Sequence, residues 1–166
     1  MKVTFRTRSL LIAALLSAGL TAALAGQNGT AEWPQWRGPS RAASVSFSAP
    51  ASWPESLTLK WKIDVGLGYA TPLLVGDRVF LFSRQNGDEV MSALDLAGGK
   101  VIWRTGYPVS FAMHSGATGH GQGPKSTPVF ADGRIYSIGM TGVVTAFDAA
   151  TGRRLWQKPG SSVVPL

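Results

Sequence analysis

The chain has 166 residues, of which 16 are Lys or Arg and 9 are Asp or Glu, and its formal net charge is +7. Three of the cations (Lys2, Arg6 and Arg8) lie within the first ten residues, and the others are scattered without a basic run, so a nucleic-acid partner is not expected. The chain contains no cysteine, so it forms no disulfide and its stability must come from packing.

The first 25 residues have the layout of a secretory signal peptide. The three cations are followed by an apolar run, residues 10–24, and by Ala23-Leu24-Ala25, an ending typical of a cleavage site before Gly26. The apolar run is shorter than the ~20 residues that a membrane span needs. We therefore expect cleavage rather than a retained anchor, export to the periplasm or the extracellular space, and no membrane span in the mature chain.

Residues 26–58 form a Pro-rich leader. It contains Trp33, Trp36 and Trp53, each close to Pro or Gly, which we expect to pack over the outside of the first repeat unit. A ligand platform is the alternative for these rings. One predicted extra strand, residues 59–63, follows the leader, and Trp61 takes an outer-strand position in it.

Two stretches of the remaining chain repeat each other. Residues 93–103 match residues 146–156 in type and spacing, and residues 71–80 match residues 127–136. The Trp spacings give a period of roughly 42 to 53 residues, in the range of four-stranded propeller blades. Short apolar alternation cut by Gly-Asp and Asp-Gly turns favours strands over helical repeats. We predict an all-β chain with two four-stranded antiparallel units, at about 69–104 and 126–158; an unrelated β-sandwich is the alternative.

Each unit ends in the pattern A-x-D-x-x-x-G-x-x-x-W. This pattern resembles the tryptophan-docking motif of the pyrroloquinoline-quinone-like β-propeller family, and residues 33–39 resemble the opening of its secreted members. The resemblance implies a partial β-propeller over residues 59–158, in which each Trp packs between the Ala of its own motif and the Gly peptide of a neighbouring motif. The docking residues so implied are Ala93, Gly99, Trp103, Ala146, Gly152 and Trp156. The first copy has Gly98 where the second has Thr151, so we expect a looser turn there.

An insertion, residues 107–125, separates the two units. Its Gly content argues against a regular strand, and long loops between blades lie at the mouth of a propeller, where ligands bind. The candidates for ligand or cofactor binding in this loop are His114, His120 and Lys125. The two histidines lack further ligands nearby, so no metal site is predicted, and the Gly run before Lys125 lacks the pattern of a phosphate loop. Lys125 either faces an anionic ligand or braces a carbonyl.

Two units do not close a propeller ring. Residues 159–166 stop where another blade should start, so we expect a truncated tail and an N-terminal fragment of a larger propeller; assembly of several chains into one ring is the alternative. The resemblance implies an exported, non-catalytic binding or scaffold module of the cell envelope, with a protein or small-ligand partner at the propeller mouth.

The alternative function is a fragment of a quinoprotein dehydrogenase, an oxidoreductase that depends on pyrroloquinoline quinone (PQQ). Enzymes of this class hold the quinone beside a calcium ion and commonly place two adjacent Cys residues over it, and this chain has no Cys. We therefore predict no catalytic residue and no cofactor.

Overall fold

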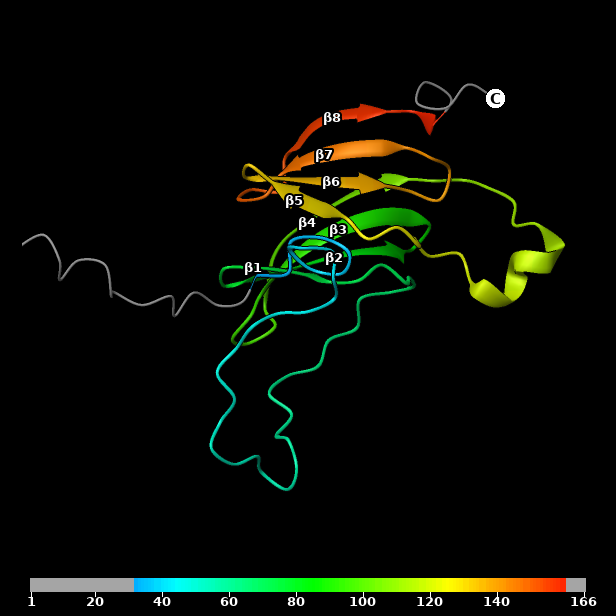
Figure 1. Cartoon of the computed structure of the whole chain (residues 1–166). Coiled ribbons are helices and arrows are strands. Elements are labelled where there is room, and N and C mark those ends of the chain that lie inside the picture. Colours follow the sequence, from blue (N-terminus) through cyan, green and yellow to red (C-terminus); the bar gives the residue numbers. More distant parts are fainter. Residues whose placement is uncertain (1–31, 161–166) are drawn as a thin grey trace, which may run out of the picture.

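Two four-stranded antiparallel sheets lie one above the other in the computed structural model, which describes residues 32–160 (Figure 1). Strand order follows chain order in both sheets, β1-β2-β3-β4 and β5-β6-β7-β8, as expected for two blade-like meanders. The first sheet consists of β1 Leu73–Val75, β2 Arg78–Gln85, β3 Asp88–Asp95 and β4 Val101–Pro108. The second consists of β5 Val129–Ala131, β6 Arg134–Ile138, β7 Val144–Asp148 and β8 Arg154–Lys158. The predicted all-β architecture is confirmed.

Tight turns set the register of these meanders. Asn86 and Gly87 both have positive φ, 51° and 95°, and so do Asp132 and Gly133, 49° and 71°. Two consecutive positive φ values define the turn type whose twist matches that of paired strands. The Asn86-Gly87 turn places Arg84 opposite Glu89 and thereby sends one side of β2 and β3 toward the second sheet.

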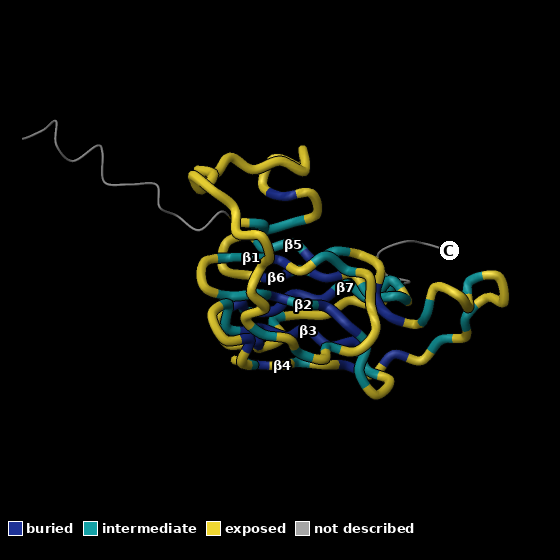
Figure 2. The backbone as a smooth tube through the Cα atoms, turned by 90° about the horizontal axis from the view of Figure 1, so that it is seen from below, coloured by how far each residue is buried: buried dark blue, intermediate teal, exposed yellow. Residues whose placement is uncertain are grey.

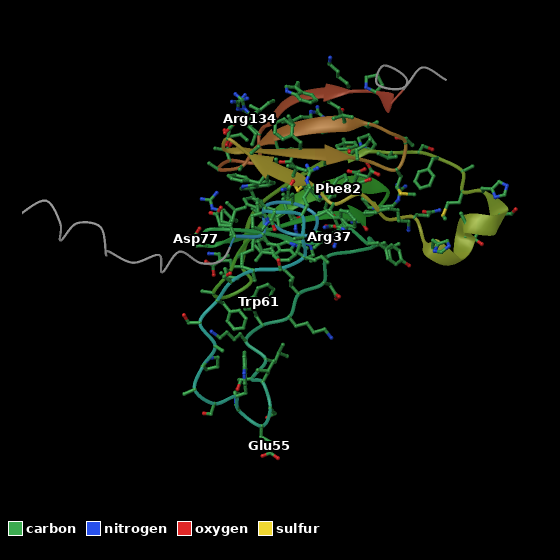
Figure 3. All side chains as sticks on the ribbon, in the orientation of Figure 1. Arg37, Glu55, Trp61, Asp77, Phe82 and Arg134 are labelled. Carbon is green, nitrogen blue, oxygen red and sulfur yellow. The ribbon has the colours of Figure 1, made fainter. Side chains whose placement is uncertain are left out.

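The core lies between the two sheets. Phe80, Ala93 and Trp103 stand side by side on neighbouring strands of the first sheet, and the Phe80 ring stacks 6.5 Å from the ring of Phe130 in the second. In Figure 3, Phe82 is seen between the sheets. The core combines residues of both units: Leu73, Phe80, Phe82, Met91, Ala93, Trp103, Tyr107, Val109, Ile135, Phe147 and Ala149. Figure 2 shows the buried residues concentrated in the strands, while most of the leader and of the insertion is exposed.

Trp103 joins the first unit to the second. Its side chain is 9% exposed, and its ring lies so close to Gly152 that a Cβ atom on that glycine would stand 2.5 Å from ring atoms. The indole N–H donates to the carbonyl oxygen of Ala149 at 3.2 Å. Trp61 lies against Gly99 in the same way, 2.6 Å from the position of such a Cβ. The structure thus places a Trp ring on the motif glycine of each unit.

Trp156 differs from the expected buried ring. It pairs with Ala146 across β7 and β8 but is 42% exposed, because no motif glycine among residues 32–160 lies on its far side. Its nearest ring is that of Tyr136, 6.1 Å away.

The leader also departs from expectation. Trp36 and Trp53 are 60% and 65% exposed, so the prediction that they pack over the first unit is wrong; only Trp33, which pairs with Leu74, is partly buried there. The leader extends away from the sheets, with Glu55 at its far end (Figure 3). The predicted strand at residues 59–63 is not formed, because no described segment pairs with it.

The first unit ends later in the chain than the sequence predicts. Strand β4 continues to Pro108 because Tyr107 and Pro108 pair with Glu89 and Asp88, so the connection to the second unit covers residues 109–128. The predicted signal peptide and most of the predicted tail lie outside the described residues. Within residues 32–160, no helix is both long and apolar enough to cross a membrane.

Candidate functional site

Three segments meet at one end of the first sheet: residues 64–69, the Asn86-Gly87 turn, and the insertion that follows β4. We call this end the loop face. Leu67 and Arg84 exchange two backbone hydrogen bonds, of 3.0 and 2.7 Å, and the N–H of Tyr69 donates to the carbonyl of Pro124 at 2.8 Å. Gly123 fits directly against this segment, since a Cβ atom there would lie 2.3 Å from the backbone of Leu67. The loop face is therefore held by backbone contacts between residues far apart in the chain.

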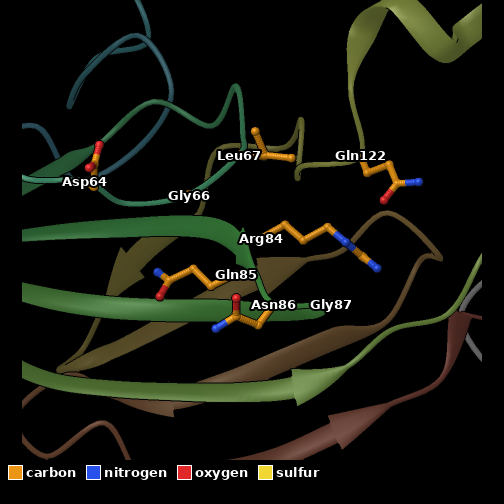
Figure 4. A pocket seen from close by; sticks show the side chains of 8 residues that line it. All are labelled: Asp64, Gly66, Leu67, Arg84, Gln85, Asn86, Gly87 and Gln122. Carbon is orange, nitrogen blue, oxygen red and sulfur yellow. The ribbon is translucent and has the colours of Figure 1, made fainter.

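The loop face contains an open depression with a volume of about 460 Å³ (Figure 4). Its lining combines one acid, one cation, three side-chain amides and small or apolar residues: Asp64, Gly66, Leu67, Arg84, Gln85, Asn86, Gly87 and Gln122. Amide groups both donate and accept hydrogen bonds, and the lining carries no excess of either charge. Such a surface suits a polar, uncharged or zwitterionic group better than a phosphate.

Arg84 connects the depression to the start of the insertion. One guanidinium nitrogen, Nη2, donates to the carbonyl of Val109 at 2.8 Å, and the guanidinium carbon lies 5.1 Å from the ring centre of Phe111. The other terminal nitrogen, Nη1, is buried and has no hydrogen-bond partner among residues 32–160. Arg84 therefore fixes the path of the loop and retains one donor that the described residues do not satisfy.

Of the three loop residues singled out from the sequence, His114 and Lys125 use their side chains to hold the loop backbone, and His120 contributes its backbone carbonyl. The Nδ1 atom of His114 accepts from the N–H of Gly116 at 3.2 Å, where the 3₁₀-helix η1 (Ser115–His120) begins. Lys125 donates to the carbonyls of His120 and Gly121, and its ammonium lies 4.0 Å from the ring centre of Tyr69. None of the three lines the depression. Of the two roles considered for Lys125, these contacts match the bracing of carbonyls.

A buried acid between the sheets went unnoticed in the sequence. Glu89 is fully buried; its carboxylate accepts from the Tyr107 hydroxyl at 2.8 Å and from the N–H of Met140 in the second unit at 2.6 Å. Burial of the phenol, followed by the charge of Glu89, raises the pKa of Tyr107 well above its usual value. A Cβ on Gly139 would collide with the Glu89 carboxylate, so glycine makes room for this contact. Glu89 thus links the units through its hydrogen bond with Met140, while Tyr107 holds it from within the first unit.

The motif aspartates have a structural role. The Oδ1 atom of Asp95 accepts one hydrogen bond, from the N–H of Gly98, whereas Oδ1 of Asp148 accepts three, from the N–H groups of Ala150 and Thr151 and from the Thr151 hydroxyl. The Thr151 hydroxyl is the main cause that holds the pKa of Asp148 below its usual value. The turn that contains Gly98 accordingly has fewer contacts, as its sequence predicts.

The donor set for a calcium-bound quinone was sought in the same residues. Calcium requires six to eight oxygen ligands, several of them carboxylates. Between residues 32 and 160, no group of three or more His, Cys, Asp or Glu side chains could hold a metal ion.

Comparison with known proteins gives a family and several structural likenesses. A family model described as outer membrane protein assembly factor BamB matches residues 18–165. Similar solved structures include a europium-containing methanol dehydrogenase (23% identity, TM-score 0.42), covering 55% of this chain and 16% of that chain. BamB from Moraxella catarrhalis has 22% identity and a TM-score of 0.42, covering 60% and 26%.

A third similar structure is the quinohemoprotein alcohol dehydrogenase ADHIIG from Pseudomonas putida HK5, with 22% identity and a TM-score of 0.40, covering 61% and 14%. The chain thus spans about a quarter or less of the length of these proteins. No curated protein gave a match.

Proposed function

Because the chain belongs to the family of PQQ-like propeller proteins that is described by the assembly factor BamB, we propose that it acts as an exported, non-catalytic binding or scaffold module of the cell envelope. In this role the two sheets are a rigid support, and recognition takes place on the loop face. Its ligand would be a protein segment or a small polar molecule.

The observation that carries this proposal is the loop face itself. His114 and Lys125 brace the insertion, whereas Gln122 lines the open depression. Leu67 in the lining and Tyr69 in the same segment are 59% and 63% exposed. Exposed apolar side chains around a polar depression are the composition of a surface that contacts other molecules. A catalytic site would instead require a nucleophile or proton-transfer group held beside its partner.

Export can be tested by the N-terminus of the protein recovered from cells. The mature chain should begin at or near Gly26 and be found in the periplasmic or secreted fraction. Recovery of an intact Met1 terminus in the membrane fraction would contradict the proposal.

The proposed lack of catalytic activity can be tested on the purified chain. Supplied with quinone and calcium, the chain should not reduce a dye with alcohols or sugars as substrates. Dye reduction that disappears in Asp148→Asn would overturn it.

A further inference from the structure

The free hydrogen-bonding side chains of the loop-face depression are amides and one carboxylate. The side chains of Asp64, Asn86 and Gln122 line the depression, and none of them has a hydrogen bond or ion pair to any residue between 32 and 160 (Figure 4). The amide nitrogen of Gln85 already donates to two neighbouring oxygens, so its amide oxygen remains as an acceptor. The side chains of the depression therefore offer both donors and acceptors, with acceptors in excess.

The lining presents little positive charge to a bound molecule. Its one cation is Arg84, whose Nη2 atom donates to the carbonyl of Val109 and whose Nη1 atom is buried. A phosphate, or the carboxylate of a zwitterion, would therefore approach Asp64 without a facing cation. Because an unpaired charge loses free energy when it leaves water, the depression favours an uncharged ligand.

The backbone of the loop face offers no edge to an extended peptide. The N–H and carbonyl groups of Leu67 and Arg84 are paired with each other, and the N–H of Tyr69 is bonded to the carbonyl of Pro124. A peptide that adds as a strand binds mainly through such backbone groups. Recognition in the depression therefore depends on the side chains.

Sugar hydroxyls match these side chains. Each hydroxyl donates and accepts, as the amides of Asn86 and Gln122 do, whereas an ammonium ligand would leave the amide N–H groups unmatched. The C–H groups of a sugar ring form an apolar face, which suits Leu67 and, two residues later, Tyr69, at 59% and 63% exposure. The Lys125 ammonium, 4.0 Å from the centre of the Tyr69 ring, helps to hold that ring in place.

We propose that the loop-face depression binds a neutral oligosaccharide. Asp64, Asn86 and Gln122 hydrogen-bond its hydroxyls, and Leu67 and Tyr69 contact the C–H face of a ring. The volume of about 460 Å³ is that of a small-molecule site, and the open side allows a longer sugar chain to continue beyond it. The inference rests on the proposed function and names the chemical class of the ligand.

The test is a titration of the isotope-labelled, purified chain, followed by NMR. The probes are the neutral hexasaccharides maltohexaose, cellohexaose, xylohexaose and N-acetylchitohexaose. At least one should give saturable shifts of the side-chain amide signals of Asn86 and Gln122. Hexagalacturonate, with a carboxylate on every ring, and a Gly-Ser hexapeptide should give none. No saturable shift with any neutral sugar, or equal binding of the charged sugar, would overturn the proposal.

Three variants locate the site. Gln122→Ala and Asp64→Ala each remove one free side-chain group without breaking a contact among residues 32–160, so both should fold, and each should weaken binding by about tenfold. Glu55→Ala removes an acid at the far end of the leader and should bind as the parent does (Figure 3). Unchanged affinity in both depression variants would contradict the assignment.

The source of the sugar is decided by a second measurement. Retention of the chain on insoluble cellulose or chitin would support a wall polymer, and binding of the soluble probes alone a free oligosaccharide. Binding of the hexapeptide in place of the sugars would overturn this inference and leave the proposed scaffold role standing. That role is decided separately, by the N-terminus, the cell fraction and the dye assay described above.

Discussion

The contact of Trp103 with Gly152, which joins the two units, can be tested by adding one methyl group. Gly152 has φ +74°, and its Cβ would lie 2.5 Å from two ring atoms of Trp103; Gly133 has φ +71° and no atom within 4 Å of its Cβ position. The two glycines therefore share the backbone conformation but differ in contact. Gly133→Ala is the matched control for Gly152→Ala, since both introduce the same left-handed strain.

The magnitudes separate the two effects. An L side chain in the left-handed conformation costs about 1–2 kcal/mol, and both variants incur this. Forcing the Trp103 ring away from Gly152 adds about 1–3 kcal/mol of overpacking, which only Gly152→Ala incurs. Chemical denaturation monitored by near-ultraviolet circular dichroism gives both free energies of unfolding. Thermal melting should show the same order, at roughly 4 °C per kcal/mol.

A double variant identifies the clash. In a Trp103→Ala background the ring is gone, so Gly152→Ala should cost no more than Gly133→Ala; the non-additivity measures the contact. Equal destabilisation by the two glycine variants in the parent protein would show that the ring does not rest on Gly152, and the account of how the units are joined would fail.

Three further outcomes are expected. Trp103→Ala should lower the free energy of unfolding by about 3–5 kcal/mol, whereas Trp36→Ala, at a ring that is 60% exposed, should change it little in the same denaturation experiment. Asp148→Asn should destabilise the protein at neutral pH. Because the folded-state pKa of Asp148 is lowered, the stability that its carboxylate contributes is present above the unfolded pKa and is lost as pH falls. The melting curves of parent and variant should therefore converge in acid. Tyr107→Phe should cost about 1–3 kcal/mol at neutral pH, because it removes the hydroxyl that donates to Oε2 of the buried Glu89 and leaves only the Met140 N–H, on Oε1. Because the Tyr107 pKa is raised on folding, the parent should lose stability as pH rises above about 10, and the variant should lack that part of the decline.

Local sequence signals predicted the strands and turns well. Asn86-Gly87 and Asp132-Gly133 are two-residue turns whose conformation depends on those residues alone, and apolar alternation marks the strands between them. The contact between a motif Trp and a neighbouring motif glycine followed from the resemblance to the docking motif, and the repeat located Trp103 and Gly152 as its members. Trp156 has the same sequence context and yet is half exposed, because burial of the ring depends on a neighbour and not on the motif.

The loop face and the buried acid were beyond such reasoning. The depression joins Arg84 of β2 to Gln122 of the insertion, and only the path of the folded chain brings these residues together. Glu89 lies on the same face of β3 as the apolar Met91 and Ala93, and its place in the sequence gives no sign of its hydrogen-bond donor in the second unit. The histidines, conspicuous in the sequence, are at the exposed end of a loop.

The order of the strands also bears on the route of folding. Every sheet pairing joins strands that are neighbours in the chain, so each meander can form from short loops, with little entropy lost on closure. The Trp103 contact with Ala149 spans 46 residues and requires both meanders to exist. We expect it to form after the rate-limiting step, so changes at Gly152 should mainly speed unfolding and thereby shorten the lifetime of the joined pair of units.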